Sequence, residues 1–556
     1  MPAGGVQTTE QLVSTWIQSN QAAIEHILDV LLAHTTPELQ ARRKEILDYA
    51  LTELAARVTN AATDPQLPQV SLSERLANKG ILPMFGFPTR VRYLFHDRPR
   101  GVHEWPPEDV VDRELDLAIS QFAPGSETVK DGLVHTAVGV VDYQPRGNAV
   151  IQAQNPLGPP IAVGLCKRCQ AVNASPQPPA TCSVCNAGQP DYELVTLSQP
   201  RGFRTAYGAT SRDFDGVFEW TARASRPKMS VRNVPMVQSA NFEVWSGSDT
   251  IYVVNDNNGR LFDFQRLAHE ETWGTQEAFE KVDIPNPRFV NGGVVDRRAL
   301  ASIKPTDVML LGVRSWPAGV TATPLDVAGR AALYSFGFML RRAAAVRLDI
   351  HERELRVGLR TLPDSSGGVT GQVFISDSLE NGAGYSSRLG TELETRALLE
   401  YVCGHDDPAF LGPLVANVDT HGNPAHATLC RTSCPDCLRD FSNLAYHNIL
   451  DWRLGLDMAR LALNVDATVD FSESYWRGLD TLAATPYFDA LGWQQTKLAG
   501  LHGGRRGNVV ELIAHPLWST DPANRHPRLE AAIAEGISAG LTVRTRSLFE
   551  VLRRPF

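Results

Sequence analysis

The chain has 556 residues, of which 43% are hydrophobic and 21% are charged, as in ordinary globular proteins. The net charge of -9 at pH 7 excludes a uniformly basic, DNA-coating protein, although it is compatible with a local basic groove. No apolar run is long enough for a membrane span, and residues 1–11 lack the features of a secretory signal. The sequence therefore predicts a cytoplasmic protein of about three or four domains, with no membrane partner.

The first half of the chain changes from helical to strand-like patterns. Apolar residues at three-to-four spacing predict helices over residues 8–62, and a shorter helix follows before Gly80. From about residue 131 to residue 315, short alternating runs predict strands. The turn sequence NDNNG at 255–259 predicts a β-hairpin between two of these strands.

The second half alternates helices and strands. Residues 325–347 form the strongest helical pattern in the chain. The further predicted elements are strands at 353–360 and 371–377, helices at 391–403 and 440–464, and a β-α-β unit at 508–518, 529–540 and 541–547. Together the elements predict a multidomain α+β protein.

Four cysteines form a pair of CxxC knuckles separated by twelve residues. They are Cys166, Cys169, Cys182 and Cys185. In a reducing cytosol such clusters are metal ligands rather than disulfides. Two knuckles place four thiolates within tetrahedral reach of one Zn²⁺ and leave no open coordination position, so the spacing predicts a structural zinc site.

The other four cysteines predict a second metal site. The block LCRTSCPDC supplies Cys430, Cys434 and Cys437, and Cys403, at the end of a predicted helix, is the fourth candidate ligand. This assignment uses all eight cysteines as two sets of four, so we expect two zinc ions per chain. Three histidines of the intervening loop are competing ligands, and an iron–sulfur cluster has the same ligand chemistry: His405, His421 and His426.

The segment SDSLENGAGYSSRLG at 376–390 allows two interpretations. Asp377 and Glu380 follow a predicted strand and are candidate Mg²⁺ ligands for nuclease chemistry. We favour a tight glycine-containing turn whose carboxylates cap the next helix, because no lysine or third carboxylate stands nearby in the sequence. Backbone N–H groups of the turn remain able to hold an anion such as phosphate.

Several catalytic signatures are absent from the sequence. It contains no P-loop, no G-x-S-x-G motif and no H-E-x-x-H motif, and we interpret His515 as a packed residue. Basic residues would bind nucleic acid only where the fold gathers them along one groove. The clusters concerned are Arg42, Arg43 and Lys44, then Arg505 and Arg506, then Arg544, Arg546, Arg553 and Arg554.

Three blocks resemble a known family. SDSLENGAGY, the C-x3-C-P-x-C-L block and FSNLAYHNILDWRLGLDMAR are similar to the MrfA-type zinc-binding (MZB) domain, found at the C-terminus of superfamily-2 DEAD/DEAH-box DNA helicases and as a stand-alone helicase partner in the DISARM anti-phage system. Weaker similarity begins near residue 75. The resemblance places the family's four zinc ligands on Cys403, Cys430, Cys434 and Cys437. The helicase motor domains have no counterpart in this chain.

The resemblance implies a division of the chain and a function. The implied division is an N-terminal helical segment (1–75), a β-rich helicase-associated region with a zinc ribbon at 166–185 (76–315), an MZB domain (316–470) and a C-terminal α/β segment (471–556). The implied function is a non-motor subunit that docks on a superfamily-2 helicase and reaches DNA through that complex, in anti-phage defence or DNA repair. The alternatives are a metal-dependent nuclease and a free-standing DNA-binding module.

Overall fold

The computed structural model describes two compact units, Met1–Val91 and Arg92–Phe556. The residues it describes are 8–33, 35, 37–64, 72–82, 90–99, 101, 105–107, 110–146, 148–208, 211–217, 226–290, 293–364, 367–405 and 407–553. Arg554, from the last of the basic clusters, lies outside these residues. Each unit is treated by itself.

The first unit is helical, as the sequence predicts. Its main helices are α1 (Thr9–Ser19), α2 (Gln21–Leu32), α4 (Arg43–Thr52) and α5 (Leu54–Thr63), with α3 (Pro37–Ala41) and α6 (Leu72–Asn78) as shorter elements. Helix α1 begins with a capping box, in which Thr8 and Gln11 satisfy each other's backbone N–H groups. The helices bury a narrow apolar strip that includes Ile17, Leu28 and Leu32.

The second unit is organised around two long antiparallel strands, β15 (Phe242–Asn255) and β18 (Asp296–Val313). Three further strands are β13 (Arg226–Met229), β19 (Leu355–Pro363) and β20 (Val369–Asp377). The successive pairings β15–β13, β13–β19, β19–β20, β20–β18 and β18–β15 close a ring of strands. Closure removes edges that would otherwise expose unpaired backbone groups.

Other strands extend the sheet from β18. Strand β10 (Tyr192–Ser198) pairs in parallel with β18 and antiparallel with β8 (Ile161–Cys166), which carries the first cysteine knuckle. Beyond β16 (Phe262–Arg266) lie β17 (Trp273–Thr275), β5 (Gly139–Val140), β11 (Phe203–Arg204), β1 (Val91–Phe95) and β2 (Val110–Glu114). The predicted strand-rich middle region is therefore confirmed.

The hairpin predicted at NDNNG is wrong. Strand β15 ends at Asn255 and β16 begins at Phe262, but the two strands do not pair with each other. Both pair antiparallel with β18, where Asn255 lies opposite Leu300 and Phe262 lies opposite Arg298. Residues 256–261 therefore form a loop excursion between two collinear strands. The sequence reports a tight turn correctly, but it does not specify which strand the flanking residues pair with.

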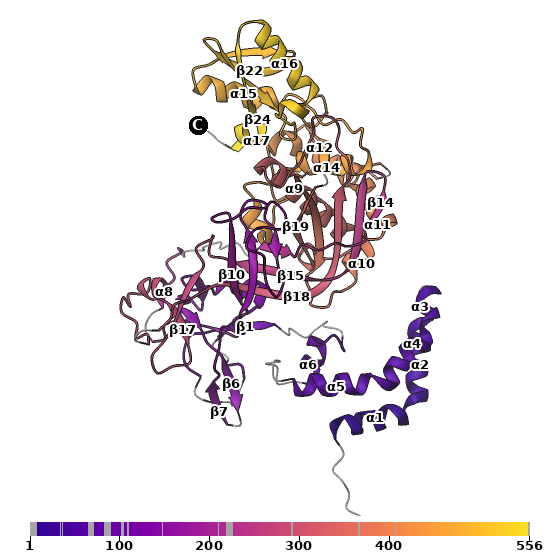
Figure 1. The fold of residues 1–556 in the computed structure, drawn as a ribbon, viewed down its shortest axis with the longest axis vertical. Coiled ribbons are helices and arrows are strands. Elements are labelled where there is room, and N and C mark those ends of the chain that lie inside the picture. The colour runs from indigo at the N-terminus through magenta and orange to yellow at the C-terminus, as the bar shows by residue number, and fades with distance from the viewer. Residues whose placement is uncertain are drawn as a thin grey trace, which may run out of the picture. The chain divides into compact units, whose positions relative to one another are not determined.

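A helical layer covers β19 and β20 (Figure 1). The long helix α9 (Val327–Leu348) is buried on most sides, because α14 (Trp452–Leu463) and α11 (Glu392–Cys403) pack against it as well as the sheet. The helix predicted over 440–464 is divided into a 3-10 helix (Phe441–Tyr446) and α14. Asp451 caps α14 by accepting the backbone N–H of Arg453, which separates the two parts.

The C-terminal residues form a small α/β layer at one end of the second unit (Figure 1). Its sheet has the order β21 (Gln494–Leu498), β22 (Leu501–Arg506), β23 (Val509–Ala514) and β24 (Thr542–Ser547). Strands β23 and β24 are parallel and are joined through α16 (Pro527–Ser538), which confirms the predicted β-α-β unit. The other helices of this C-terminal layer are α15 (Leu479–Ala490) and α17 (Leu548–Arg553). The chain is thus a multidomain α+β protein.

Candidate metal centres

The first cysteine group is assembled by two loops of the same design. Cys166 ends β8, and the following turn brings Cys169 back so that its N–H lies 3.4 Å from the Cys166 sulfur. In the second loop the N–H of Val184 lies 3.4 Å from the Cys182 sulfur. Each turn is closed by a residue at positive φ, Gln170 in one and Asn186 in the other. The chain thus forms both knuckles that the CxxC spacing predicts.

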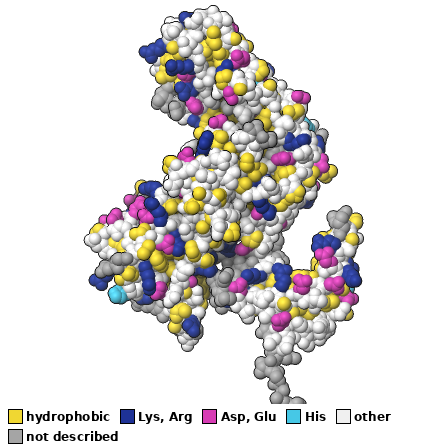
Figure 2. Space-filling view, in the orientation of Figure 1, with side chains coloured by type: hydrophobic (Ala, Val, Ile, Leu, Met, Phe, Trp, Pro, Cys, Tyr) yellow, Lys and Arg dark blue, Asp and Glu magenta, His cyan; other side chains and the backbone are white. Residues whose placement is uncertain are grey.

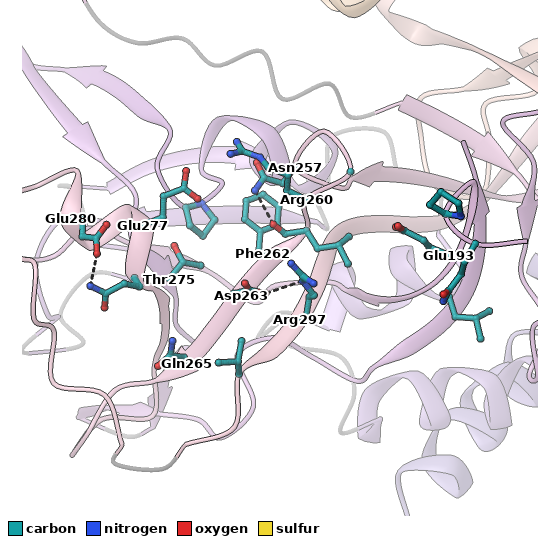
Figure 3. Close-up of a pocket in the computed structure, with 18 residues that line it drawn as sticks. Glu193, Asn257, Arg260, Phe262, Asp263, Gln265, Thr275, Glu277, Glu280 and Arg297 are labelled. Carbon is teal, nitrogen blue, oxygen red and sulfur yellow. Dashed lines mark hydrogen bonds and ion pairs between the residues drawn. The ribbon is translucent and has the colours of Figure 1, made fainter. Parts of the chain in front are cut away.

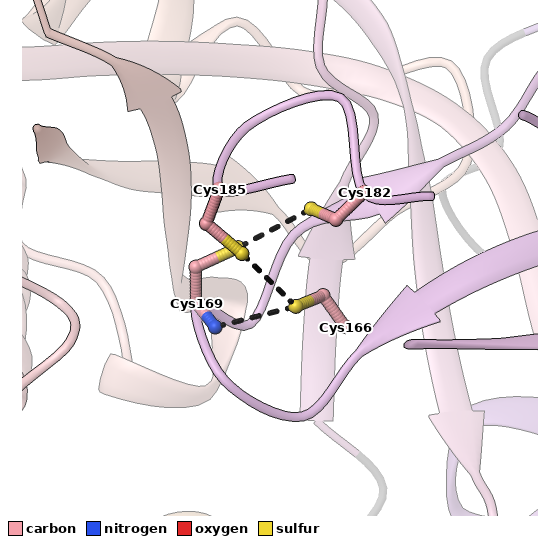
Figure 4. A group of neighbouring side chains, drawn as sticks. All are labelled: Cys166, Cys169, Cys182 and Cys185. Carbon is pink, nitrogen blue, oxygen red and sulfur yellow. Dashed lines mark hydrogen bonds between the residues drawn. The ribbon is translucent and has the colours of Figure 1, made fainter. Parts of the chain in front are cut away.

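The sulfur positions of this group suit a tetrahedral metal ion. The Sγ atoms of Cys166 and Cys185 are 3.6 Å apart, and those of Cys169 and Cys182 are 3.5 Å apart (Figure 4). All four Sγ atoms lie within 4.8 Å of one another, and all four cysteines are free thiols. Zn–S bonds of about 2.3 Å in a tetrahedron separate the sulfurs by about 3.8 Å. The residues therefore fit Zn²⁺, which when bound would cross-link the two knuckles.

The electrostatics of this group also call for a cation. The hydrogen bond from the Cys166 thiol lowers the pKa of Cys182, whereas the thiol contact with Cys166 raises the pKa of Cys169. Four thiolates this close together repel one another strongly, so they cannot all ionise without a compensating positive charge. A divalent metal supplies that charge, and four sulfur ligands leave no position for a substrate. The geometry is that of a structural site.

The second group contains three of the predicted cysteines and one histidine. Cys430, Cys434 and Cys437 come together with His426, and their ligand atoms lie within 4.8 Å of one another. The Cys437 sulfur is 3.9 Å from that of Cys430 and 3.8 Å from that of Cys434. A hydrogen bond from Cys430 lowers the pKa of Cys437 to about 4, so one thiolate is available near neutral pH.

The imidazole of His426 is oriented as a metal ligand. Its Nδ1 lies 2.8 Å from the carbonyl oxygen of Leu414, and a proton on Nδ1 would be donated to that oxygen. This fixes the lone pair on Nε2, which is buried, and the imidazole interacts with the Cys437 thiol. A buried nitrogen acceptor beside three thiols is accounted for by a metal ion. Sequence reasoning treated His426 only as a competing ligand.

Cys403 lies outside this group, which departs from the sequence assignment. It is the last residue of α11, and its side chain is buried in the large apolar core of the second unit. Burial raises the pKa of the Cys403 thiol to about 12, as expected for a neutral packed side chain. The position of Cys403 at the end of α11 fixes its side chain in the core. His426 is the first residue of α13 (His426–Leu429), and Cys430 is the residue that follows this helical turn.

The start of α14 holds the second group in place through backbone contacts. The indole Nε1 of Trp452 donates to the carbonyl of Cys430 at 3.3 Å. The guanidinium of Arg453 donates to the carbonyls of Cys430, Arg431 and Ala427. Both side chains are almost fully buried. Trp452 and Arg453 form the WR sequence of the MZB-like block. Their hydrogen bonds therefore hold the metal-ligand loop against the helical layer.

The turn at 376–390 is built around Asp377, which is fully buried. One carboxylate oxygen accepts the N–H groups of Ala383 and Tyr385, at 2.6 and 3.2 Å, and the other accepts the N–H of Ser386 at 2.9 Å. Asp377 therefore caps α10 (Tyr385–Leu389), as the turn interpretation predicts. Its oxygens are committed to backbone donors, and no acidic metal cluster occurs among the described residues of this turn.

Asp377→Ala should lower the free energy of unfolding by about 3 kcal/mol, because three buried N–H groups lose a charged acceptor. Chemical denaturation of the full chain measures this loss. Glu380→Gln, in the same turn, is the comparison and should change stability by less than about 1 kcal/mol. An equal loss in both variants would contradict the capping role of Asp377.

Four of the eight described residues of the basic clusters are paired with acidic neighbours. Arg42 pairs with Glu45 and Arg43 with Asp29. The remaining pairs are Arg546 with Glu511 and Glu550, and Arg553 with Asp451. Lys and Arg side chains are interspersed with Asp and Glu over the visible surface (Figure 2).

His515 is a packed residue, as predicted. Its side chain is fully buried, and its Nε2 lies 3.4 Å from Asp457, which is also fully buried. Asp457 accepts hydrogen bonds from the hydroxyl of Tyr475 at 2.6 Å and from the indole of Trp476 at 2.9 Å. The network belongs to the core rather than to an open catalytic site.

A cavity of about 1010 Å³ lies beside the loop excursion at 256–261 (Figure 3). Its charged residues are mainly acidic, and Asp263 is paired with Arg297 at 3.0 Å. No histidine or cysteine lines it. Separately, none of the described helices is long and apolar enough to cross a membrane.

The comparisons with known proteins include a solved helicase structure. No protein-family model matches the sequence, and no curated protein matches it. Among solved structures, the chain is similar to a DUF1998 helicase, MrfA, crystallised bound to DNA, with a TM-score of 0.30 and 9% identity over 64% of this chain. The match covers 32% of the MrfA chain.

Proposed function

We propose that this chain is a zinc-binding, non-motor subunit that acts with a separately encoded superfamily-2 helicase and reaches DNA through that complex. The observation that carries the proposal is the second ligand group. Three cysteines of the MZB-like block and His426 converge there, and the same block supplies Trp452 and Arg453 to hold the ligand loop. Both groups have four protein ligands, so each ion would act in folding rather than in chemistry.

The absence of a P-loop from the sequence assigns ATP hydrolysis to a partner. In this proposal the helical segment 1–75 and the β-rich region 76–315, with its ribbon at 166–185, flank the motor. The MZB domain at 316–470 and the α/β segment at 471–556 complete the subunit. The setting we propose is anti-phage defence or DNA repair in the cytoplasm, as for the family that the blocks resemble.

The test is affinity purification of the tagged chain from its native host, followed by an assay of the bound proteins for DNA-stimulated ATPase activity. A superfamily-2 helicase should co-purify in stoichiometric amount, and the isolated chain should not hydrolyse ATP. Recovery of the chain without any ATPase would contradict the proposal.

A reconstitution separates a functional partner from an adventitious one. Adding the purified chain to the recovered helicase should tighten DNA binding by about tenfold or more. Cys434→Ser, which disrupts the second ligand group, should abolish this gain. Arg388→Gln, an exposed charge change away from the ligands, is the matched control and should retain it. An undiminished effect with Cys434→Ser would contradict a role for the metal-holding domain.

A further inference from the structure

We propose that a second cavity, beside the first cysteine knuckle, binds a nucleoside monophosphate unit, either as a free nucleotide or as the phosphorylated end of a nucleic-acid strand. The cavity has a volume of about 370 Å³. It adjoins the large acidic cavity and shares Glu193, Gly259, Arg260 and Leu261 with it. The inference does not depend on a helicase partner.

The apolar part of this cavity comes from the sheet and the loop excursion. Leu165 of β8, Val195 of β10 and Val254 of β15 are buried, and Leu261 packs beside them in the same small core. All four line the cavity. They offer a surface against which a flat, largely apolar group such as a nucleobase can be buried.

The polar part of the cavity carries an excess of positive charge. Its basic residues are Lys167, Arg226, Lys228 and Arg260, and its acidic residues are Glu193 and Asp256. Lys167 is neutralised by Glu193 at 2.8 Å. Among the described residues, Arg226, Lys228 and Arg260 have no ion-pair partner within 4 Å. Asp256 and the thiols of Cys166 and Cys169 act against the lowering of the Lys228 pKa, and the Arg226 guanidinium lies 5.6 Å from the centre of the Tyr446 ring.

Two of these cations are brought together by strand register. Arg226 and Lys228 stand two residues apart on β13, opposite Val254 and Tyr252 of β15, so both side chains leave the same face of the sheet. Burial, with Arg226 as a like-charged neighbour, lowers the pKa of Lys228 to about 8. Two adjacent, partly desolvated cations are costly unless an anion is bound between them.

Size and charge together select the ligand class. A phosphate group has the charge and the acceptor oxygens that two guanidinium groups and an ammonium group recognise. The volume is larger than phosphate requires and falls at the lower end of small-molecule sites. A phosphate joined to a nucleoside fills both parts, with its anion toward Arg226 and Lys228 and its base on the apolar surface.

The metal knuckle forms one wall of the cavity. Cys166 and Lys167 line it, and the Lys167 side chain passes beside Gly259, where a Cβ would lie 3.6 Å from the lysine Cε. Gly259 has a φ of +83°, which a glycine adopts without strain, and this turn brings Arg260 to the cavity. The ligand site should therefore depend on the first metal site, but not on the second.

The experiment is isothermal titration calorimetry on the zinc-loaded full chain. Adenosine 5′-monophosphate, adenosine and inorganic phosphate are titrated separately. The monophosphate should bind at one site per chain, at least tenfold more tightly than adenosine or inorganic phosphate. Lys228→Gln and Arg226→Gln should each weaken its binding by at least tenfold. Arg168→Gln, an exposed neighbour on the same knuckle that does not line the cavity, should bind as the unchanged chain does.

The outcomes are separable. Equal affinity for adenosine and its monophosphate, or an equal loss in Arg168→Gln and Lys228→Gln, would overturn the proposal, as would no saturable binding up to millimolar nucleotide. Circular dichroism of each variant establishes that it is folded. Competition by a 5′-phosphorylated oligonucleotide, but not by its 5′-hydroxyl form, identifies strand ends as the source. If the mononucleotide binds tightly and the 5′-phosphorylated oligonucleotide does not compete, the ligand is the free nucleotide.

Discussion

Cys169→Ser should reduce the zinc content of the chain from two ions to one and unfold the region around residues 161–198. Cys169 is fully buried, and its sulfur has a direct neighbour at 3.5 Å in Cys182. A serine hydroxyl is a poor zinc ligand, and the free energy of metal binding in such sites is folding free energy, on the order of 10 kcal/mol. The two knuckles lie in the chain segment that connects β8 to β10. Without the metal ion, this connection is no longer held in a fixed structure.

Metal analysis and amide hydrogen exchange measure this result together. Zinc content reports the ion, and exchange of the β8 and β10 amides reports the local structure. Arg168→Gln alters the same knuckle without touching a ligand and should keep two ions and full protection. Two ions retained by Cys169→Ser would show that the first group is not a zinc site. Protection retained after the loss of one ion would show that the metal does not hold these strands.

His426→Ala should weaken the second zinc site by about 100-fold or more, whereas Cys403→Ala should leave both ions in place. Loss of a group that merely orients a ligand typically costs 10- to 100-fold in metal affinity, and removal of the ligand itself should cost at least as much. The Nε2 of His426 is the buried nitrogen beside the three thiols, while Cys403 belongs to the apolar core. Competition with a zinc chelator of known affinity gives the two values.

Stability measurements keep the two variants distinguishable. Cys403→Ala leaves a small void in the core and should cost about 1 to 2 kcal/mol in unfolding free energy without loss of metal. His426→Cys restores a fourth ligand and should recover most of the zinc affinity. If Cys403→Ala lost the ion and His426→Ala kept it, the ligand set implied by the family resemblance would be right and the set seen in the structure would be wrong.

The two ligand groups show what spacing can and cannot predict. In the first group every ligand belongs to a CxxC pair, so local chain geometry determines where the sulfurs go. In the second group, the sequence places three cysteines close together, but it offers several candidates for the fourth ligand. The choice of Cys403 followed the cysteine count and the resemblance. The HxxxC spacing of His426 and Cys430, which places both on one side of a helical turn, was the available signal.

The strands show a similar limit. The alternation at 242–259 and at 307–313 predicts strands where β15 and part of β18 lie, because alternation depends on burial of one face. Which strands pair depends on contacts between distant residues. The turn sequence at 255–259 therefore predicts a hairpin, whereas the strands on either side of the loop both pair with β18. The loop at 256–261 lines both cavities. The cavity lined by Arg226 and Lys228 was not foreseen for the same reason.

The strand ring also sets the order in which the chain can fold as it is synthesised. Strand β13 needs β19, whose residues follow about 130 positions later, and β10 needs β18 about 100 positions later. The first metal-ligand group spans only residues 166–185, so it is complete on a nascent chain long before its sheet. Zinc capture should thus precede strand closure during translation, and fragments that stop before residue 377 should remain unable to bury their strands.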